Sequence, residues 1–256
     1  MTGLATYERH GDVAKITLND GKVNVMSRAM IEAVNECLDH AENDGVGVIL
    51  RAEGRFFSAG FDLKVFQNGT AEDIYTMRHS GAEMVLRIHE FPNPVVAACH
   101  ATAYPMGAFP IIASDFRIGT KGDHKIGMNE VAIGLSLPRW AIELSRSRLN
   151  PAYLNRATVT GEMFSHEEGL KAGFFDQVVE AGELEDAALA AAERLAKLDL
   201  AAMNATKRNV RSRLIGLARK LIDEDITLEG CEARVAERDA TASETTPLAS
   251  SAEKAQ

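Results

Sequence analysis

Residues 54–64 read GRFFSAGFDLK, and they separate a predicted strand from a predicted helix. Glycines interrupt this stretch, which shows neither the alternation of a strand nor the spacing of an amphipathic helix. Its centre, Ser58-Ala59-Gly60, consists of small residues, so the backbone there can approach a ligand closely. The stretch predicts a turn at a binding site, and an ordinary glycine turn is the alternative.

Regular elements are predicted before this turn. Alternating apolar residues over Ala14–Leu18 predict a strand with one buried face, and Val46–Arg51 is typical of a buried strand. Ser27 is a predicted N-cap, because apolar residues from Met30 to Ala41 follow it at helical spacing and predict an amphipathic helix over Ser27–Asn43. Gly45 ends that helix.

Strands and helices continue to alternate after the turn, and helices dominate the last third of the chain. This order predicts an α/β core with a helical appendage. The predicted elements are a helix at Glu72–Glu90, a buried strand at Pro94–Cys99, a short helix at Gly107–Ser114, a strand at Asp115–Gly119, a helix at Glu183–Lys197 and helical pieces over Asp199–Arg238.

Four blocks of the sequence resemble the conserved blocks of the crotonase (enoyl-CoA hydratase/isomerase) superfamily. The first is the turn at 54–64, and the second is Pro94–Ala98 with Asp115 and Arg117 downstream. The third is IGMNEVAIGL at 126–135, and the fourth spans 157–179. A single block would be weak evidence, whereas four in one order and register indicate the family.

The resemblance implies an α/β fold of the crotonase type. It implies a spiral core of repeated ββα-like turns over residues 1–195 and a helical C-terminal trimerisation region over 196–239. It also implies a homotrimer or a hexamer. Residues 240–256 are small and polar, so we expect a disordered tail there.

The resemblance further implies an acyl-CoA thioester as substrate, with negative charge developing on the thioester oxygen. Two backbone N–H groups aimed at that oxygen would stabilise the charge. By family position these are the N–H groups of Phe61 and Met106. Pro105 has no N–H, but Met106 keeps its own, and a short helix expected from Gly107 would add its positive dipole end.

Two positions decide which crotonase reaction we expect. Family hydratases hold a water between two glutamates, and this chain has Phe109 at the first position and Glu130 at the second. One carboxylate suffices for a 1,3-proton shift, and an apolar neighbour would raise its pKa by desolvation. This pattern resembles the Δ3,Δ2-enoyl-CoA isomerase branch. We therefore expect isomerisation of 3-enoyl-CoA to trans-2-enoyl-CoA, with Glu130 as the catalytic residue.

Family position also suggests which residues lie along the CoA and the acyl chain. Lys22 either approaches a CoA phosphate or is merely solvated, and Asp62 either lies near the adenine or caps the segment that follows. The full set expected to bind CoA or substrate is Lys22, Val23, Val25, Ala59, Asp62, Leu63, Gly107, Phe109 and Leu135.

Other functions stay open as alternatives. A hydratase, a dehydratase or a thioester hydrolase would be favoured by a second carboxylate, such as Glu83, directed at the same substrate carbon. A non-catalytic acyl-CoA-binding relative is suggested by the altered loop at 104–109. His100 is interpreted as a core residue, and Trp140 and Tyr153 as packing residues. A basic cluster is either a solvated helix face or a contact for CoA phosphates; its members are Lys207, Arg208, Arg211 and Arg213.

Composition restricts the partners and the compartment. The formal net charge of -9 argues against nucleic acid or an anionic membrane as the main partner. The three cysteines are widely spaced without a zinc-binding pattern, so we expect no metal and a reducing compartment. No cofactor is expected, because coenzyme A would enter as part of the substrate. The N-terminal residues lack a signal-peptide pattern and no run of eighteen apolar residues occurs, so the expected location is cytoplasmic.

Overall fold

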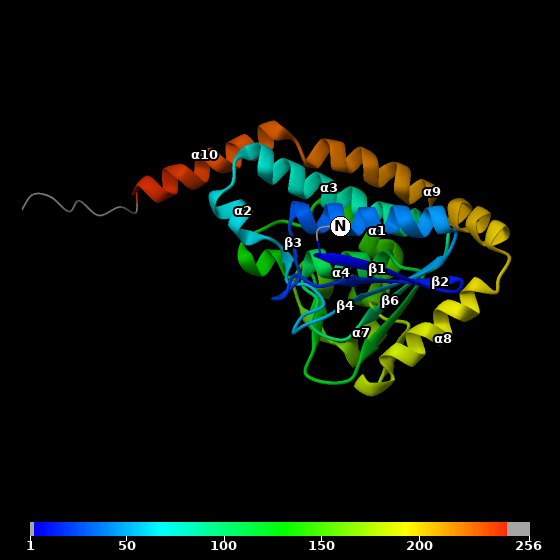
Figure 1. Cartoon of the computed structure of the whole chain (residues 1–256). Coiled ribbons are helices and arrows are strands. Elements are labelled where there is room, and N and C mark those ends of the chain that lie inside the picture. Colours follow the sequence, from blue (N-terminus) through cyan, green and yellow to red (C-terminus); the bar gives the residue numbers. More distant parts are fainter. Residues whose placement is uncertain (1–2, 245–256) are drawn as a thin grey trace, which may run out of the picture.

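The computed structural model describes residues 3–244, and a six-stranded sheet forms its centre (Figure 1). The strands lie in the order β1-β2-β4-β6-β7-β10. The first pair is antiparallel, and every later pair is parallel. The strands are β1 (Ala5–His10), β2 (Val13–Leu18), β4 (Gly47–Ala52), β6 (Val95–Cys99), β7 (Phe116–Thr120) and β10 (Gln177–Val179).

A second row of short strands runs beside the main sheet. β3 (Val25–Met26) pairs in parallel with β5 (Gly60–Phe61). Single parallel bridges then join Ser58 to Ala103 and Ala103 to Ile126, which belongs to β8 (Lys125–Gly127). Each turn of the chain thus adds one long strand, one short extended segment and, in the first three turns, a helix. This is the repeated ββα arrangement that the family resemblance implied.

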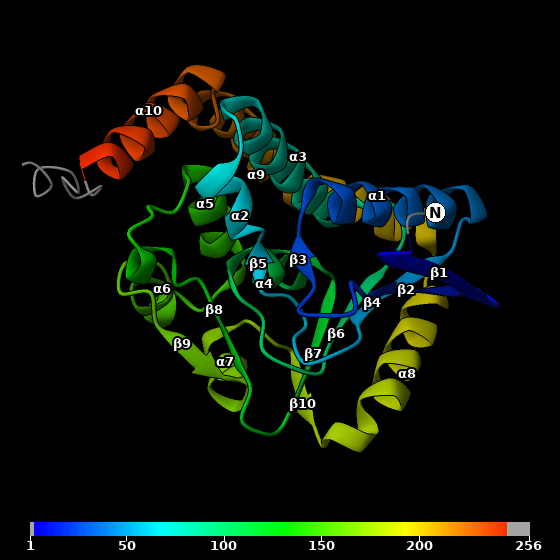
Figure 2. The ribbon, with the colours of Figure 1, turned by 60° about the vertical axis from the view of Figure 1, so that its left-hand side comes forward.

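Helices cover both faces of the sheet. α8 (Leu184–Ala196) packs on one face, and α1 (Arg28–Asp44), α3 (Ala71–Glu90) and α4 (Pro105–Ala113) lie on the other (Figures 1 and 2). The central strands are buried on both faces, which explains their continuous apolar sequences. In β6, for example, Val95, Ala97 and Cys99 join the larger core, whereas Val96 and Ala98 face α8.

The predicted helix boundaries are close to the observed ones. The Ser27 side chain accepts a hydrogen bond from the Met30 N–H at the start of α1, and Gly45 ends the helix with a left-handed φ of 67°. The short helix α4 begins at Pro105, two residues earlier than predicted, because proline is well suited to the first helical position. This difference places Met106 inside the first helical turn.

The remaining helices lie mostly in the C-terminal half. α9 (Leu200–Asp225) runs beside α3, and α10 (Leu228–Glu244) follows it and packs against α3 near α2 (Figure 2). α10 continues past residue 239 as far as Glu244, so the expected tail starts too early, and residues 245–256 lie outside the described part. The other elements are α2 (Leu63–Asn68), η1 (Glu130–Ile133, a 3₁₀ helix), α5 (Arg139–Arg148), α6 (Pro151–Thr158), β9 (Met163–Ser165), α7 (His166–Ala172) and η2 (Ala181–Glu183).

A buried charge cluster fastens α9 to the core. The Lys207 ammonium donates to the carbonyls of Phe91 and Asn93 at 2.8 and 3.0 Å, and it lies 2.7 Å from an Asp115 carboxylate oxygen. Arg211 pairs with the other oxygen of Asp115 at 2.9 Å. Burial lowers the pKa of Lys207, but every polar group in this cluster has a partner. Two members of the predicted basic cluster are therefore structural.

We predict that Lys207→Met destabilises the protein by about 2–4 kcal/mol, because it leaves buried acceptors without their donor. Urea unfolding measures this change. Arg213→Gln is the matched control, since Arg213 is exposed on the same helix. Equal stability of the two variants would show that the buried cluster does not anchor α9.

Candidate active site

A cavity of about 370 Å³ lies where the second strand row meets the helices. Its wall combines segments that are far apart in the sequence: α2 with the turn before it, α3, the start of α4, η1 with the loop after it, the start of α5, the C-cap of α9, and α10. The lining residues are Ala59, Gly60, Phe61, Leu63, Phe66, Arg78, Tyr104, Pro105, Met106, Phe109, Asn129, Glu130, Ile133, Leu135, Ser136, Pro138, Trp140, Ile226 and Arg234.

Hydrogen bonds fix the turn that carries Phe61. Asn24 is buried with a φ of 55°, and its side-chain amide donates to the carbonyls of Glu53 and Phe56. The Ser58 hydroxyl donates to the Asn24 carbonyl at 2.6 Å and accepts from the Gly60 N–H at 3.1 Å. Asn24 adopts the left-handed region that asparagine tolerates better than most residues. The turn is thus a rigid support for the backbone beside the cavity.

The first turn of α4 packs directly against that support. A Cβ atom added to Gly107 would lie 2.6 Å from the Ser58 Cβ, and one added to Gly60 would lie 3.6 Å from the Met106 nitrogen. The N–H groups of Gly107 and Ala108 donate to the Tyr104 carbonyl. Within the described residues the Met106 N–H has no acceptor, as expected for the second residue of a helix. A free N–H at a helix start favours an anion.

Glu130 is the only acidic residue that lines the cavity within residues 3–244. Only 9% of it is exposed, and its Oε2 atom is buried without a hydrogen-bond partner. Burial raises the pKa of Glu130 to about 7. The rings of Phe109 and Trp140, with centroids 5.2 Å apart, form part of the same wall. Glu130 therefore lies in a largely apolar cavity that can hold it in either protonation state near neutral pH.

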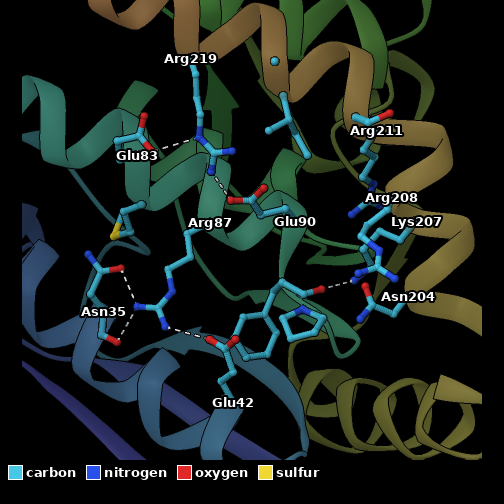
Figure 3. Close-up of a pocket in the computed structure, with 16 residues that line it drawn as sticks. Asn35, Glu42, Glu83, Arg87, Glu90, Asn204, Lys207, Arg208, Arg211 and Arg219 are labelled. Atoms are coloured by element: carbon cyan, nitrogen blue, oxygen red, sulfur yellow. Dashed lines mark hydrogen bonds and ion pairs between the residues drawn. The ribbon is translucent and has the colours of Figure 1, made fainter. Parts of the chain in front are cut away.

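Glu83 does not reach this cavity. It lines a separate groove between α1, α3 and α9, where its carboxylate lies 3.6 Å from Arg219 (Figure 3). Lys207 and Arg208 line that second groove as well. The possible second carboxylate and the basic cluster thus lie apart from Glu130.

Seven of the predicted site residues line the cavity together. They are Ala59, Phe61, Leu63, Met106, Phe109, Glu130 and Leu135. Trp140, predicted as a packing residue, both packs on Phe109 and lines the cavity, and its Nε1 atom is buried without a partner.

The other predicted residues support the turn or lie near it. The Val23 carbonyl accepts from the Ala59 N–H, and Val25 pairs with Gly60. Asp62 caps α2 by accepting from the Lys64 N–H at 3.0 Å, which was one of its two predicted roles.

Three further predictions concern residues outside the cavity wall. Lys22 is exposed, and its N–H donates to the Asp20 carboxylate. Gly107 allows the contact with Ser58 described above. The Nε2–H of His100 donates to the Gly54 carbonyl at 2.8 Å, whereas its buried Nδ1 has no partner among the described residues. His100 was interpreted as a core residue with its polar atoms satisfied, and this applies to Nε2 but not to Nδ1.

Sequence reasoning missed the side of the cavity formed by α2, α3, α9 and α10. Phe66, Arg78, Ile226 and Arg234 line it there. No motif marks these residues, and Arg234 reaches the cavity through the packing of α10 against α3. Arg238 holds that arrangement by donating to carbonyls of α2 and its C-cap.

Within the described residues, no set of three His, Cys, Asp or Glu side chains is arranged to hold a metal ion. None of the described helices has both the length and the apolar character that a bilayer crossing needs.

The chain is similar to known proteins both in sequence and in fold. The family model for enoyl-CoA hydratase/isomerase matches residues 8–230. A probable enoyl-CoA hydratase of Bacillus subtilis is 35% identical over 169 residues, which is 63% of this chain and 63% of that protein. Carnitinyl-CoA dehydratase of Salmonella paratyphi A is 28% identical over 90% of this chain and 95% of its own length.

Solved structures agree with the family match. An enoyl-CoA hydratase/isomerase family protein from Pseudomonas syringae superimposes with a TM-score of 0.85 at 39% identity, covering 88% of this chain and 97% of that one. The apo structure of a Mycobacterium tuberculosis enoyl-CoA isomerase gives 0.83 at 35% identity, covering 87% and 97%. Further similar structures carry hydratase names.

Replacing Glu130 by Gln tests the electrostatics of the cavity without any substrate. A glutamate with a pKa of 4.5 in the unfolded chain and about 7 in the folded one binds more protons when folded, so its stability contribution falls as pH rises between these values. The amide does not titrate. We expect Glu130→Gln to gain up to about 3 kcal/mol over the wild type between pH 4 and pH 8. A stability difference that is the same at both pH values would contradict the raised pKa.

Proposed function

Since this chain belongs to the enoyl-CoA hydratase/isomerase family and processes acyl-CoA, we propose that it isomerises 3-enoyl-CoA to trans-2-enoyl-CoA. One observation carries the proposal: Glu130 is the single acidic side chain that the described residues place in the cavity wall. A 1,3-proton shift needs one group that accepts and then returns a proton, whereas the addition of water is helped by two.

The reaction proceeds through a dienolate. The Glu130 carboxylate removes a proton from C2 of the 3-enoyl thioester, and the electron pair moves through the carbonyl so that negative charge gathers on the thioester oxygen. The N–H groups of Phe61 and Met106 donate to that oxygen. Neutral Glu130 then returns the proton to C4, which leaves the double bond between C2 and C3. Atoms and charge balance, and the carboxylate is regenerated.

The geometry supports each of these roles. Phe61 and Met106 line the cavity on two backbone segments that pack directly against one another. The Met106 N–H lies in the first turn of α4, where the helix dipole adds to its attraction for an oxyanion. Losing one such donor typically costs about a hundredfold or more in rate. A Glu130 pKa of about 7 suits a group that is a base in one step and an acid in the next.

Hydration is the second candidate, because several similar proteins carry hydratase or dehydratase names. In this chain the position expected for the other glutamate is Phe109, which is 3% exposed and packs against Trp140. Glu83, the other candidate, pairs with Arg219 in a different groove. These contacts favour isomerisation, and the same assay distinguishes the two reactions.

Glu130→Gln should lower isomerase kcat by about a thousandfold or more, because the amide cannot accept the C2 proton. The assay supplies 3-hexenoyl-CoA and trans-2-hexenoyl-CoA to the purified protein in parallel and follows conjugated thioester and 3-hydroxyacyl-CoA. In the wild type, kcat/KM for 3-hexenoyl-CoA should rise with pH through about 7, because the free enzyme needs the deprotonated carboxylate. An active Glu130→Gln variant, or a wild type that only hydrates, would end the proposal.

Phe109→Glu should introduce hydration of trans-2-hexenoyl-CoA, because it adds a second carboxylate to the wall that carries Glu130. Phe109→Gln is the matched control. Glutamine has nearly the same shape as glutamate but no charge, so this variant should not hydrate trans-2-hexenoyl-CoA. Both variants are assayed by the appearance of 3-hydroxyhexanoyl-CoA. Hydration by the wild type at the rate of Phe109→Glu would show that a second carboxylate at position 109 is not needed for hydration.

A further inference from the structure

Two arginines line the cavity although most of its wall is apolar. Arg78 projects from α3 and is half-buried, and Arg234 comes from α10 at the rim. Neither guanidinium makes a hydrogen bond or an ion pair with another described residue. Among residues 3–244, Glu130 is the one acidic residue in the wall, and its raised pKa reduces the negative charge that it supplies near neutral pH.

The surroundings do not neutralise the two charges. Asp225 lies within electrostatic range of Arg78, but its carboxylate is already bound by the backbone and guanidinium of Arg139. The Arg234 guanidinium lies 5.4 Å above the ring of Phe66, which also lines the cavity. A ring face attracts a cation but leaves its N–H donors free. Arg78 is half-buried and Arg234 is exposed, and both line the cavity with N–H donors that are free to meet a ligand.

The positions of the arginines suggest which part of a ligand they meet. Phe61, Met106 and Glu130 come from β5, α4 and η1, whereas Arg78 and Arg234 come from α3 and α10, which lie together with α2 at one side of the molecule (Figure 2). The two arginines therefore come from other elements of the cavity wall than the reacting groups do. Trp140 adds a buried Nε1–H without an acceptor to the same wall.

We propose that Arg78 and Arg234 recognise a carboxylate at the end of the acyl chain remote from the thioester, so that the preferred substrates are monothioesters of dicarboxylic acids. This inference rests on the proposed function in one respect, namely that the cavity holds the acyl group. Guanidinium groups match a carboxylate with paired N–H donors, and such charge-assisted bonds are stronger than neutral hydrogen bonds. The phosphates of CoA are the other anions that could meet these arginines.

Binding of unreactive thioesters tests this proposal independently of catalysis. Hexanoyl-CoA and octanoyl-CoA are titrated into the purified protein beside hexanedioyl-CoA and octanedioyl-CoA, each of the last two carrying one free carboxylate. We expect about tenfold or tighter binding of a dicarboxylic thioester than of its matched monocarboxylic partner at one of the two lengths. Arg78→Gln should abolish that preference, and Arg234→Gln should reduce it. Arg213→Gln, an exposed change on α9, should leave it intact.

The outcomes separate the sources of negative charge. If the arginine variants weaken both members of a pair equally, and the weakening disappears with 3′-dephospho-CoA thioesters, the arginines bind CoA phosphate and the proposal is wrong. Equal binding of both members by the wild type at both lengths would also overturn it. Because saturated thioesters cannot isomerise, a missing isomerase activity would leave this test unaffected.

Discussion

The close contact between the Ser58 turn and the first turn of α4 is the constraint on which the site depends. A side chain at Gly107 would meet the Ser58 Cβ at 2.6 Å, so these backbones can approach only because position 107 is glycine. The contact brings Gly60 near the Met106 nitrogen and places Phe61 and Met106 in one wall. Hydrogen bonds from the Asn24 amide to the Phe56 carbonyl and from the Ser58 hydroxyl to the Asn24 carbonyl fix the turn. The parallel strand row joins the same segments, so the spiral core and the site form one structure.

Burial in this cavity changes the acid–base chemistry of Glu130. Glu130 opens a short 3₁₀ helix and lines a cavity to which Phe109 and Trp140 contribute aromatic surface. Desolvation disfavours the charged form, which moves the pKa toward neutrality. A group in that state can take and return a proton with little bias. The replacement of an acid by Phe109 thus affects both the number of carboxylates and the basicity of the one that is present.

Sequence predicted the elements whose boundaries are set by local chemistry. Ser27 and Gly45 mark the ends of α1 because capping and left-handed φ depend on neighbouring residues alone. The family blocks placed Phe61, Met106 and Glu130 in one site. The start of α4 was predicted two residues late, because Pro105 was treated as preceding the helix. Arg78 and Arg234 were not predicted, since no motif marks Arg78 on α3 and Arg234 reaches the cavity through the packing of α10 on α3. The sequence did not show whether Glu83 reaches the Glu130 cavity. Its ion pair with Arg219 places it in the separate groove.

Transfer of a labelled proton tests the central claim, that one carboxylate serves both proton positions, most directly. Wild-type protein converts 3-hexenoyl-CoA carrying deuterium at both C2 positions, and mass spectrometry locates deuterium in the product. A single Glu130 shuttle predicts deuterium at C4 of trans-2-hexenoyl-CoA, since the abstracted label returns from the same buried carboxylate before it exchanges with solvent. A product whose new C4 hydrogen always comes from solvent, or a 3-hydroxyacyl product in its place, would contradict the account.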